Sequence, residues 1–204
     1  GNPVRGALIQ AGAARHYDYA GQRPLHLLVL GGSLGAKPIN EVLPATLRAV
    51  RDSGGQLELW HQTGEAHLDV VRQSYGELLD QGARVDPFIE DMAAAYGWAD
   101  LVLCRAGALT VSELAIMGCP SILVPLPYAI DDHQSANARS LSDRGAALLL
   151  RQADMTADGL AASLRSYMAH PQMLANMAAE ARAAATPDAA ARVSDCCEEL
   201  IHGR

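Results

Sequence analysis

The chain has 204 residues, of which 50% are hydrophobic and 19% charged, and its formal net charge is −7 at pH 7. This length fits one domain with an appendage, and the composition excludes collagen-like, disordered and coiled-coil chains. The most hydrophobic stretch, residues 99–126, is interrupted by Arg105 and Glu113, so the sequence predicts no membrane span. The negative charge argues against a nucleic-acid backbone or an anionic membrane surface as the main ligand.

The cysteines and the first residues bear on where the protein works. The cysteines at 104, 119, 196 and 197 form no CxxC pair and no zinc-spaced cluster with histidine, which indicates a reducing cytoplasm. The chain begins Gly-Asn-Pro without a methionine or an apolar signal region. We therefore expect residue 1 to be a cut inside a longer protein.

From residue 25 onward, short apolar runs alternate with longer segments of helical period, and Gly, Pro or Asx residues mark the junctions. The apolar runs predict strands at 25–30, 57–60, 84–88, 101–104, 121–124 and 146–150. The segments between them predict helices at 37–51, 65–80, 90–98, 109–117 and 132–143. Because runs such as LHLLVL are nearly continuous in apolar residues, both faces of the sheet should be buried. The pattern predicts an α/β fold with a doubly wound, six-stranded, mainly parallel sheet.

The same pattern divides the chain into three segments. Residues 1–24 are predicted to be an interdomain linker, because 11–24 are small and polar without a clear period. Residues 25–155 form the predicted Rossmann-like domain. Residues 156–204 are predicted to form a helical C-terminal tail, with helices at about 156–168, 171–184 and 188–201.

The first strand runs into a glycine-rich turn, GGSLGA at 31–36, followed by a helix. Small residues let the backbone approach an anion, and the N–H groups at a helix start carry partial positive charge. Glycine is also favoured in any tight strand-to-helix turn, so a packing role stays open. The turn matches neither GxGxxG nor GxxxxGK[ST], which removes support for NAD or ATP.

The fourth strand leads into RAGALTVSE at 105–113, where Ala108 to Thr110 would open a helix at the carboxyl edge of the sheet. Doubly wound folds bind ligands at this edge, and helix N–H groups suit a diphosphate. Glu113, in the first turn or one turn inside, could accept hydrogen bonds from vicinal ribose hydroxyls. The alternative is that Glu113 only complements the helix dipole.

Asp131, Asp132, His133 and Gln134 begin another helix after a proline-bounded loop. Adjacent aspartates are common N-caps, and with one histidine they do not make a typical metal site. Gln134 and Asn137, at i and i+3, would share a helix face and could bond sugar hydroxyls. We therefore expect no metal here.

Several segments together resemble one family. They are GNPVR at 1–5, GGSLGA at 31–36, WHQTG at 60–64, PFIEDMAAAY at 87–96, ADLVLCRAGALTVSELAIMGCPSILVPLP at 99–127 and DDHQSANA at 131–138. The chain resembles the C-terminal half of the MurG family, bacterial N-acetylglucosaminyltransferases that convert lipid I into lipid II during peptidoglycan synthesis. Members are GT-B glycosyltransferases with two Rossmann-like domains, and the C-terminal domain holds the UDP-N-acetylglucosamine donor. The resemblance implies that residues 25–155 are this donor-binding domain.

The resemblance also implies which residues contact the donor. Arg5 and Ser33 would face the diphosphate, the backbone of Ile89 would meet the uracil edge, and Gln134 would reach the sugar hydroxyls. The ALTVSE stretch would place helix N–H groups on the phosphates and a carboxylate on the ribose. Its residues are Ala108, Leu109, Thr110, Val111, Ser112 and Glu113.

The acceptor machinery of the family is expected outside this chain. The resemblance places a GGTGGH-type loop, a histidine base and a membrane-binding patch in the N-terminal domain. We therefore expect no catalytic residue, metal or cofactor in this chain. We expect lipid I to bind, and the cytoplasmic face of the inner membrane to be contacted, only by the full-length protein. The expected ligand is UDP-N-acetylglucosamine, and no nucleic acid is expected. A nucleotide-sugar-binding module without catalysis and a UDP-sugar epimerase of similar fold remain as alternatives.

Overall fold

The protein is described from a computed structural model, which covers residues 2–32, 35–127 and 132–202. Its centre is a six-stranded sheet in the order β3-β2-β1-β4-β5-β6, and every pairing is parallel. The strands are β1 Leu25–Leu30, β2 Leu57–Gln62, β3 Ala83–Asp86, β4 Leu101–Cys104, β5 Ser121–Leu123 and β6 Ala147–Leu149. The predicted doubly wound fold is confirmed, and the sheet is wholly parallel.

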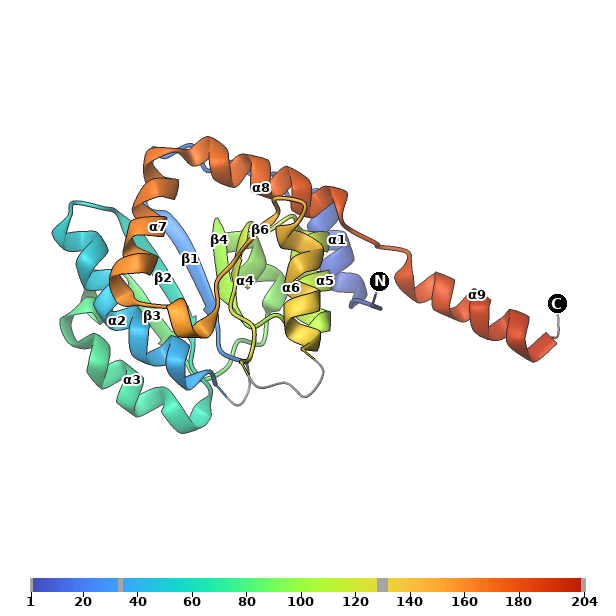
Figure 1. Cartoon of the computed structure of the whole chain (residues 1–204), viewed down its shortest axis with the longest axis horizontal. Coiled ribbons are helices and arrows are strands. Elements are labelled where there is room, and N and C mark those ends of the chain that lie inside the picture. Colours follow the sequence, from blue (N-terminus) through green and yellow to red (C-terminus); the bar gives the residue numbers. More distant parts are fainter. Residues whose placement is uncertain (1, 33–34, 128–131, 203–204) are drawn as a thin grey trace.

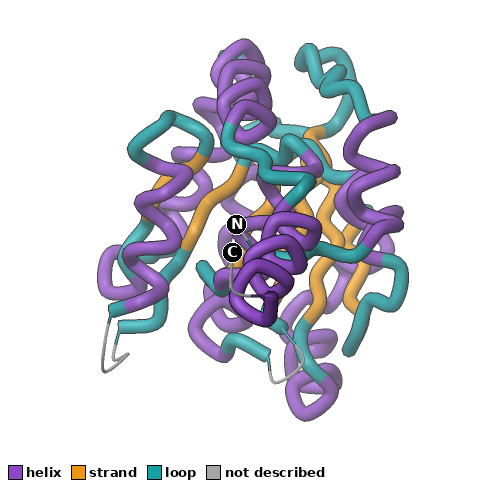
Figure 2. Tube along the Cα trace, turned by 90° about the vertical axis from the view of Figure 1, so that its right-hand side faces the viewer, coloured by secondary structure: helices purple, strands orange, loops and turns teal. Residues whose placement is uncertain are grey.

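Helices lie on both sides of the sheet (Figures 1 and 2). One face is covered by α2 Lys37–Asp52, α3 Leu68–Tyr75 and α7 Ala157–Ala169. The other is covered by α1 Gly6–Ala14, α4 Met92–Trp98, α5 Ala108–Met117 and α6 His133–Ser142. Helix α8, Pro171–Ala183, packs against α5 and α7, and α9, Ala189–His202, extends away from the body in Figure 1. Short 3-10 helices span Glu65–His67, Gly76–Gln81 and Gln152–Asp154.

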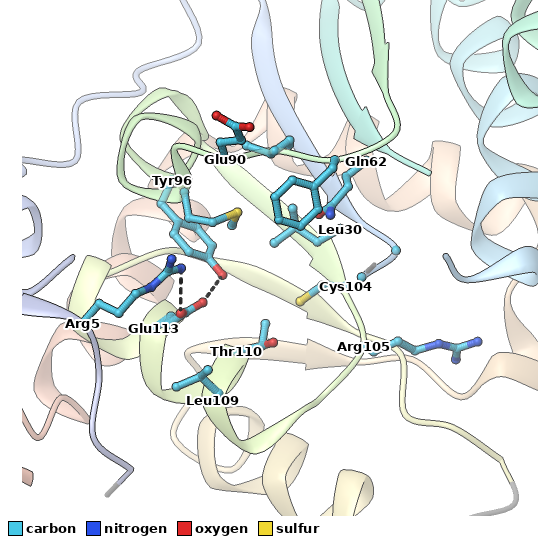
Figure 3. Close-up of a pocket in the computed structure, with 15 residues that line it drawn as sticks. Arg5, Leu30, Gln62, Glu90, Tyr96, Cys104, Arg105, Leu109, Thr110 and Glu113 are labelled. Atoms are coloured by element: carbon cyan, nitrogen blue, oxygen red, sulfur yellow. Dashed lines mark hydrogen bonds and ion pairs between the residues drawn. The ribbon is translucent and has the colours of Figure 1, made fainter. Parts of the chain in front are cut away.

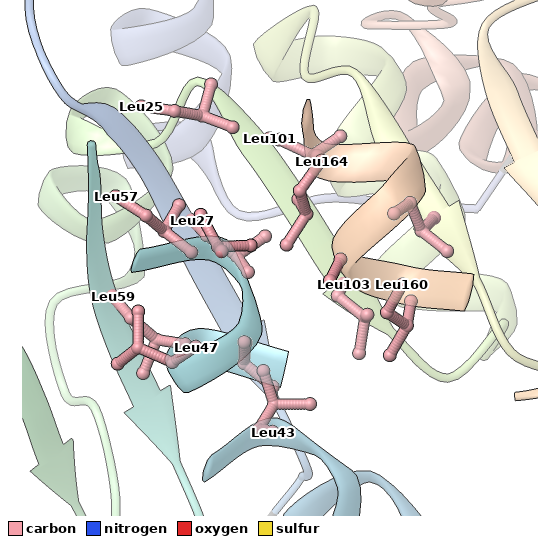
Figure 4. Packing of buried hydrophobic residues seen from close by; sticks show 14 of the residues in the cluster. Leu25, Leu27, Leu43, Leu47, Leu57, Leu59, Leu101, Leu103, Leu160 and Leu164 are labelled. Carbon is pink, nitrogen blue, oxygen red and sulfur yellow. The ribbon is translucent and has the colours of Figure 1, made fainter. Parts of the chain in front are cut away.

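The core follows from the alternation of side chains along each strand. Leu25 and Leu27 of β1 point to the face covered by α2 and α7, whereas Leu28 and Leu30 belong to the cluster on the opposite face. Figure 4 shows leucines of β1, β2 and β4 meeting leucines of α2 and α7. Burial on both faces explains why the central strands β1 and β4 are apolar at almost every position.

Residues 6–14 form a helix where the sequence predicted a linker. Helix α1 packs against α5 so closely that a Cβ on Gly12 would collide with the carbonyl oxygen of Ile116. Arg15, directly after α1, donates to the carbonyl oxygens of Met117 and Gly118 at 2.7 and 2.8 Å, at the end of α5. The segment before β1 is therefore part of the packed domain.

Two further predictions differ from the structure in detail. The predicted helix at 65–80 is divided, because Gly76 has a φ of +54° and ends α3 at Tyr75. The first part of the predicted helical tail packs on the domain, since Leu160 and Leu164 of α7 are buried in the core. Among the described residues, no helix is both long and apolar enough to cross a bilayer.

Candidate functional site

A pocket of about 460 Å³ opens at the carboxyl edge of the sheet, beside the ends of β1 and β4 (Figure 3). The strand order runs outward in opposite directions from these two neighbours, to β2 and β3 on one side and to β5 and β6 on the other. Doubly wound folds bind ligands at such a switch point. The residues at the two strand ends that line the pocket are Leu30, Gly31, Gly32, Cys104 and Arg105.

Glu113 lies inside this pocket. The residue is 6% exposed and stands in the second turn of α5, which has no acid in its first turn. The hydroxyl of Tyr96 donates to Oε2 of Glu113 at 3.0 Å, and Nη2 of Arg5 lies 3.6 Å from Oε1. An acid that only complemented its helix dipole would lie in the first turn and stay solvated. The dipole alternative is therefore wrong for Glu113, whose carboxylate faces the pocket.

The hydroxyl of Tyr96 stays protonated and donates to this carboxylate. Burial and the charge of Glu113 raise the pKa of the Tyr96 hydroxyl well above its usual value. A protonated phenol beside a carboxylate can only donate, so the direction of the hydrogen bond is fixed.

The first turn of α5 presents backbone donors to the same pocket. The first amide of the helix with a backbone acceptor is that of Val111, which donates to the oxygen of Gly107 at 2.9 Å. The N–H groups of Ala108, Leu109 and Thr110 precede it and have no acceptor in the helix. Leu109 and Thr110 line the pocket. This end of α5 therefore suits an anion.

Two arginines bring positive charge to the pocket from opposite directions. Arg5 is largely exposed, whereas Arg105 is partly buried at the end of β4, and Figure 3 shows its guanidinium away from Glu113. Arg105 donates to the carbonyl oxygen of Val124 at 3.1 Å and to Oε1 of Gln152 at 2.6 Å.

Arg105 lacks a counter-ion among the described residues. No carboxylate there pairs with it, and its buried Nε has no hydrogen-bond acceptor. Burial lowers the pKa of its guanidinium, which indicates a poorly solvated cation. Arg105 was not among the predicted contacts, although its place directly after a strand at the carboxyl edge is a usable signal in the sequence.

The glycines of the GGSLGA turn have different roles. A Cβ on Gly31 would lie 2.8 Å from the carbonyl oxygen of Gln62, and one on Gly35 would collide with the oxygen of Thr63. Gly32, with a φ of +75°, has open space around it and lines the pocket. The packing explanation therefore holds for Gly31 and Gly35, while Gly32 leaves backbone open to a ligand.

A buried polar network supports the end of β2, against which this turn packs. Asn40 of α2 donates through Nδ2 to the oxygen of Thr63 at 3.1 Å, so its Oδ1 is free to accept. Nε2 of His61 lies 3.0 Å from that Oδ1, and Nδ1 lies 3.0 Å from the hydroxyl of Tyr75. The proton of His61 is therefore assigned to Nε2, with Tyr75 donating to Nδ1. The partners of His61 come from α2 and α3, so spacing along the chain does not reveal them.

The other predicted contacts are only partly brought together. Ile89 lines the pocket, and no described residue bonds its backbone N–H or carbonyl oxygen. Val111 packs into the core, and Ser112 donates to the oxygen of Ala108 at 3.1 Å. Gln134 does not line this pocket, and its Oε1 accepts from the N–H of Leu126 at 3.1 Å. The prediction for Ser33 lies outside the described residues.

The capping role predicted for the adjacent aspartates is not seen at Asp132. Asp132 stands at the N-cap position of α6, but its side chain makes no capping hydrogen bond and lies 3.7 Å from Nη2 of Arg139. Asp131 lies outside the described residues. Within the described ranges, no group of three or more His, Cys, Asp or Glu side chains could hold a metal ion.

The chain matches a known protein family over most of its length. Residues 26–193 match the glycosyltransferase family 28 C-terminal domain. The chain belongs to this family. Family 28 membership places the chain among glycosyltransferase domains, as the sequence predicted.

Several relatives of this family 28 chain are known. It is 52% identical to the UDP-N-acetylglucosamine–N-acetylmuramyl-(pentapeptide) pyrophosphoryl-undecaprenol N-acetylglucosamine transferase of Cellvibrio japonicus and 53% identical to that of Azotobacter vinelandii. All of this chain and 56% of each relative are covered, so the chain spans about half the length of these curated relatives.

Solved structures agree. The crystal structure of Acinetobacter baumannii MurG matches 96% of this family 28 chain, with a TM-score of 0.79 and 39% identity, over 55% of its own length. A putative UDP-N-acetylglucosamine 2-epimerase from Listeria monocytogenes matches 97%, with a TM-score of 0.65 and 15% identity. At that identity the epimerase shares the fold alone.

Proposed function

We propose that this chain is the donor-binding half of an inverting glycosyltransferase that transfers N-acetylglucosamine from UDP-N-acetylglucosamine to lipid I, forming lipid II. The observation that carries the proposal is the buried carboxylate of Glu113 beside the open first turn of α5, in one pocket at the switch point. A carboxylate suits the vicinal hydroxyls of a ribose, and helix N–H groups suit a diphosphate. The relatives named above support the choice of sugar and acceptor.

The proposed contacts follow from this arrangement. Glu113 accepts from the ribose hydroxyls, and the N–H groups at the start of α5 bind the diphosphate together with Arg5 and Ser33. The backbone of Ile89 meets the uracil edge, which is supported by its lack of a partner among the described residues. Gln134 reaches the sugar through its amide nitrogen, because its Oε1 already accepts from Leu126.

The chemistry of the proposed reaction divides between two halves of the full-length protein. The C4 hydroxyl of the acceptor attacks the anomeric carbon, the bond from that carbon to the phosphate oxygen breaks, and UDP leaves. Arg5, Arg105 and the start of α5 would stabilise the negative charge on the departing diphosphate. The acceptor proton goes to a base in the other half, at the cytoplasmic face of the membrane.

A titration tests the proposal. We expect the chain to bind UDP and UDP-N-acetylglucosamine in calorimetry, to bind ADP more weakly, and to leave lipid I unconverted. A chelator should not change UDP affinity, because arginines and helix N–H groups supply the positive charge. Turnover of lipid I by this chain alone would contradict the division of roles, and equal affinity for ADP would contradict the uracil contact.

Two alternatives predict different results. A nucleotide-sugar-binding module would bind the same ligands without any acceptor half in the full-length protein. An epimerase would convert the sugar of UDP-N-acetylglucosamine without lipid I. The 15% identity to the epimerase gives no support for that activity beyond the fold.

A further inference from the structure

Glu113 is held in place by a second side chain. Tyr96 of α4 is 0% exposed, and its hydroxyl donates to Oε2 of the carboxylate at 3.0 Å. The other described partner, Arg5, lies 3.6 Å from Oε1 and has a side chain that is 64% exposed. One partner is therefore packed in the core, and the other can move into solvent.

The hydrogen-bond capacity of the carboxylate shows what Tyr96 leaves available. An ionised carboxylate has about four acceptor positions on its two oxygens, whereas a phenol has one proton. Tyr96 occupies one position on Oε2, so Oε1 and the remaining position on Oε2 are left for a ligand. A vicinal diol needs two acceptors at a fixed spacing, which one oriented carboxylate provides.

We propose that Tyr96 is a positioning residue for recognition of the ribose hydroxyls, acting by fixing the orientation of the Glu113 carboxylate. This inference rests on the proposed function. A glutamate side chain loses considerable rotamer freedom when it is ordered, so a fixed donor is needed to keep one orientation. Arg5 is the weaker anchor, because its guanidinium lies 3.6 Å from Oε1, beyond hydrogen-bond distance, and its side chain is 64% exposed. Tyr96 approaches from Oε2 and stays bonded while the ligand is present.

The test is to replace Tyr96 by phenylalanine and compare UDP with 2′,3′-dideoxyuridine diphosphate, which lacks both hydroxyls. The unchanged protein should prefer UDP. In Tyr96→Phe this preference should narrow by roughly tenfold, the size expected for a hydrogen bond that involves a charged group. The affinity for the dideoxy nucleotide should stay within about twofold, because that ligand gains nothing from an oriented carboxylate.

Tyr75 offers a matched control. It is also 0% exposed, and its hydroxyl makes a buried hydrogen bond of 3.0 Å, to Nδ1 of His61 rather than to a pocket residue. Tyr75→Phe should lower the free energy of unfolding by a similar amount and leave the preference for UDP over the dideoxy nucleotide unchanged. An equal loss of both nucleotides in Tyr96→Phe would overturn the inference, since a purely structural role has that result.

Glu113→Ala separates this inference from the proposed function. If Glu113→Ala removes the preference for UDP and Tyr96→Phe keeps it, the positioning role is wrong and the ribose contact stands. If the unchanged protein does not bind UDP, the proposed function and the inference fail together.

Discussion

The guanidinium of Arg5 and the carboxylate of Glu113 form an ion pair, with Nη2 3.6 Å from Oε1. The sequence predicted both as donor contacts, but for different parts of the ligand, the diphosphate and the ribose. We expect donor binding to separate this pair. We expect the ribose hydroxyls to replace Arg5 on the carboxylate, which leaves the guanidinium free to meet the diphosphate.

Replacing Glu113 by alanine should weaken UDP binding by about 1.5 to 3 kcal/mol, the range for hydrogen bonds to a charged group. Calorimetric titration with UDP measures the loss. Asp158 is a suitable control, because it is an exposed acid in the first turn of α7 that does not line the pocket. Asp158→Ala should leave UDP affinity unchanged. Unchanged UDP affinity in Glu113→Ala would remove the ribose role.

Arg105→Gln should weaken UDP binding by roughly tenfold or more, because a charge-assisted contact to the diphosphate is lost. Uridine has no phosphate, so its affinity should stay nearly constant. Arg105 also bonds Val124 and Gln152, and the free energy of unfolding should be measured alongside. If uridine and UDP lose affinity equally, Arg105 supports the end of β5 and does not contact the diphosphate.

Gly35→Ala should destabilise the fold by several kcal/mol and weaken UDP binding. Its φ is +75°, which costs a non-glycine residue about 1 to 2 kcal/mol, and the added Cβ would collide with the oxygen of Thr63. Gly54 separates the two effects, because its φ is +81° with no atom near the added Cβ. Gly54→Ala should show the backbone cost alone. Equal losses in urea denaturation would mean that the contact with Thr63 is unimportant.

Stability should fall in mild acid because of His61. Burial lowers the pKa of His61 to about 3, whereas an unfolded histidine titrates near 6.5. The stabilisation is therefore complete above about pH 6.5 and is lost as pH falls toward 3, since only the unfolded chain takes up the proton. In this range the free energy of unfolding should fall by up to about 1.4 kcal/mol for each pH unit.

Urea denaturation between about pH 7 and about pH 4.5 measures this slope. His61→Gln should remove that part of the dependence, whereas His16→Gln, at an exposed position, should keep it. A slope that is the same in His61→Gln and in the unchanged protein would show that other groups control the acid response.

Gln134→Ala should weaken the binding of UDP-N-acetylglucosamine by about 1 to 2 kcal/mol and leave the binding of UDP nearly unchanged. The preference over the C4 epimer UDP-N-acetylgalactosamine should narrow, because a site that bonds a hydroxyl discriminates against its epimer. The variant also frees the N–H of Leu126, so both nucleotides must be compared. Equal losses for UDP and for the sugar nucleotide would contradict the sugar contact.

The sequence by itself determined the order of strands and helices and the parallel sheet. Runs such as Leu25–Leu30 are apolar at all but one position, which is typical of a strand buried on both faces. The sequence also located the strand ends that form the pocket. A glycine-rich turn follows the first strand, and a helix begins shortly after the fourth. Glu113, one turn inside such a helix, lines the pocket, and its contact with a ribose stays a prediction.

Only the tertiary structure decided the contacts between distant segments. Helix α1 was not predicted, because the contacts that hold it come from distant parts of the chain. Gly12 packs closely against α5, and Arg15 donates to carbonyl oxygens at the end of α5. Tyr96 and Arg105 reach the pocket from separate elements, and although both lie in segments that resemble the family, neither segment by itself shows that these side chains meet at one pocket. Periodicity reports which face of an element is buried; which side chains meet across elements depends on packing in three dimensions.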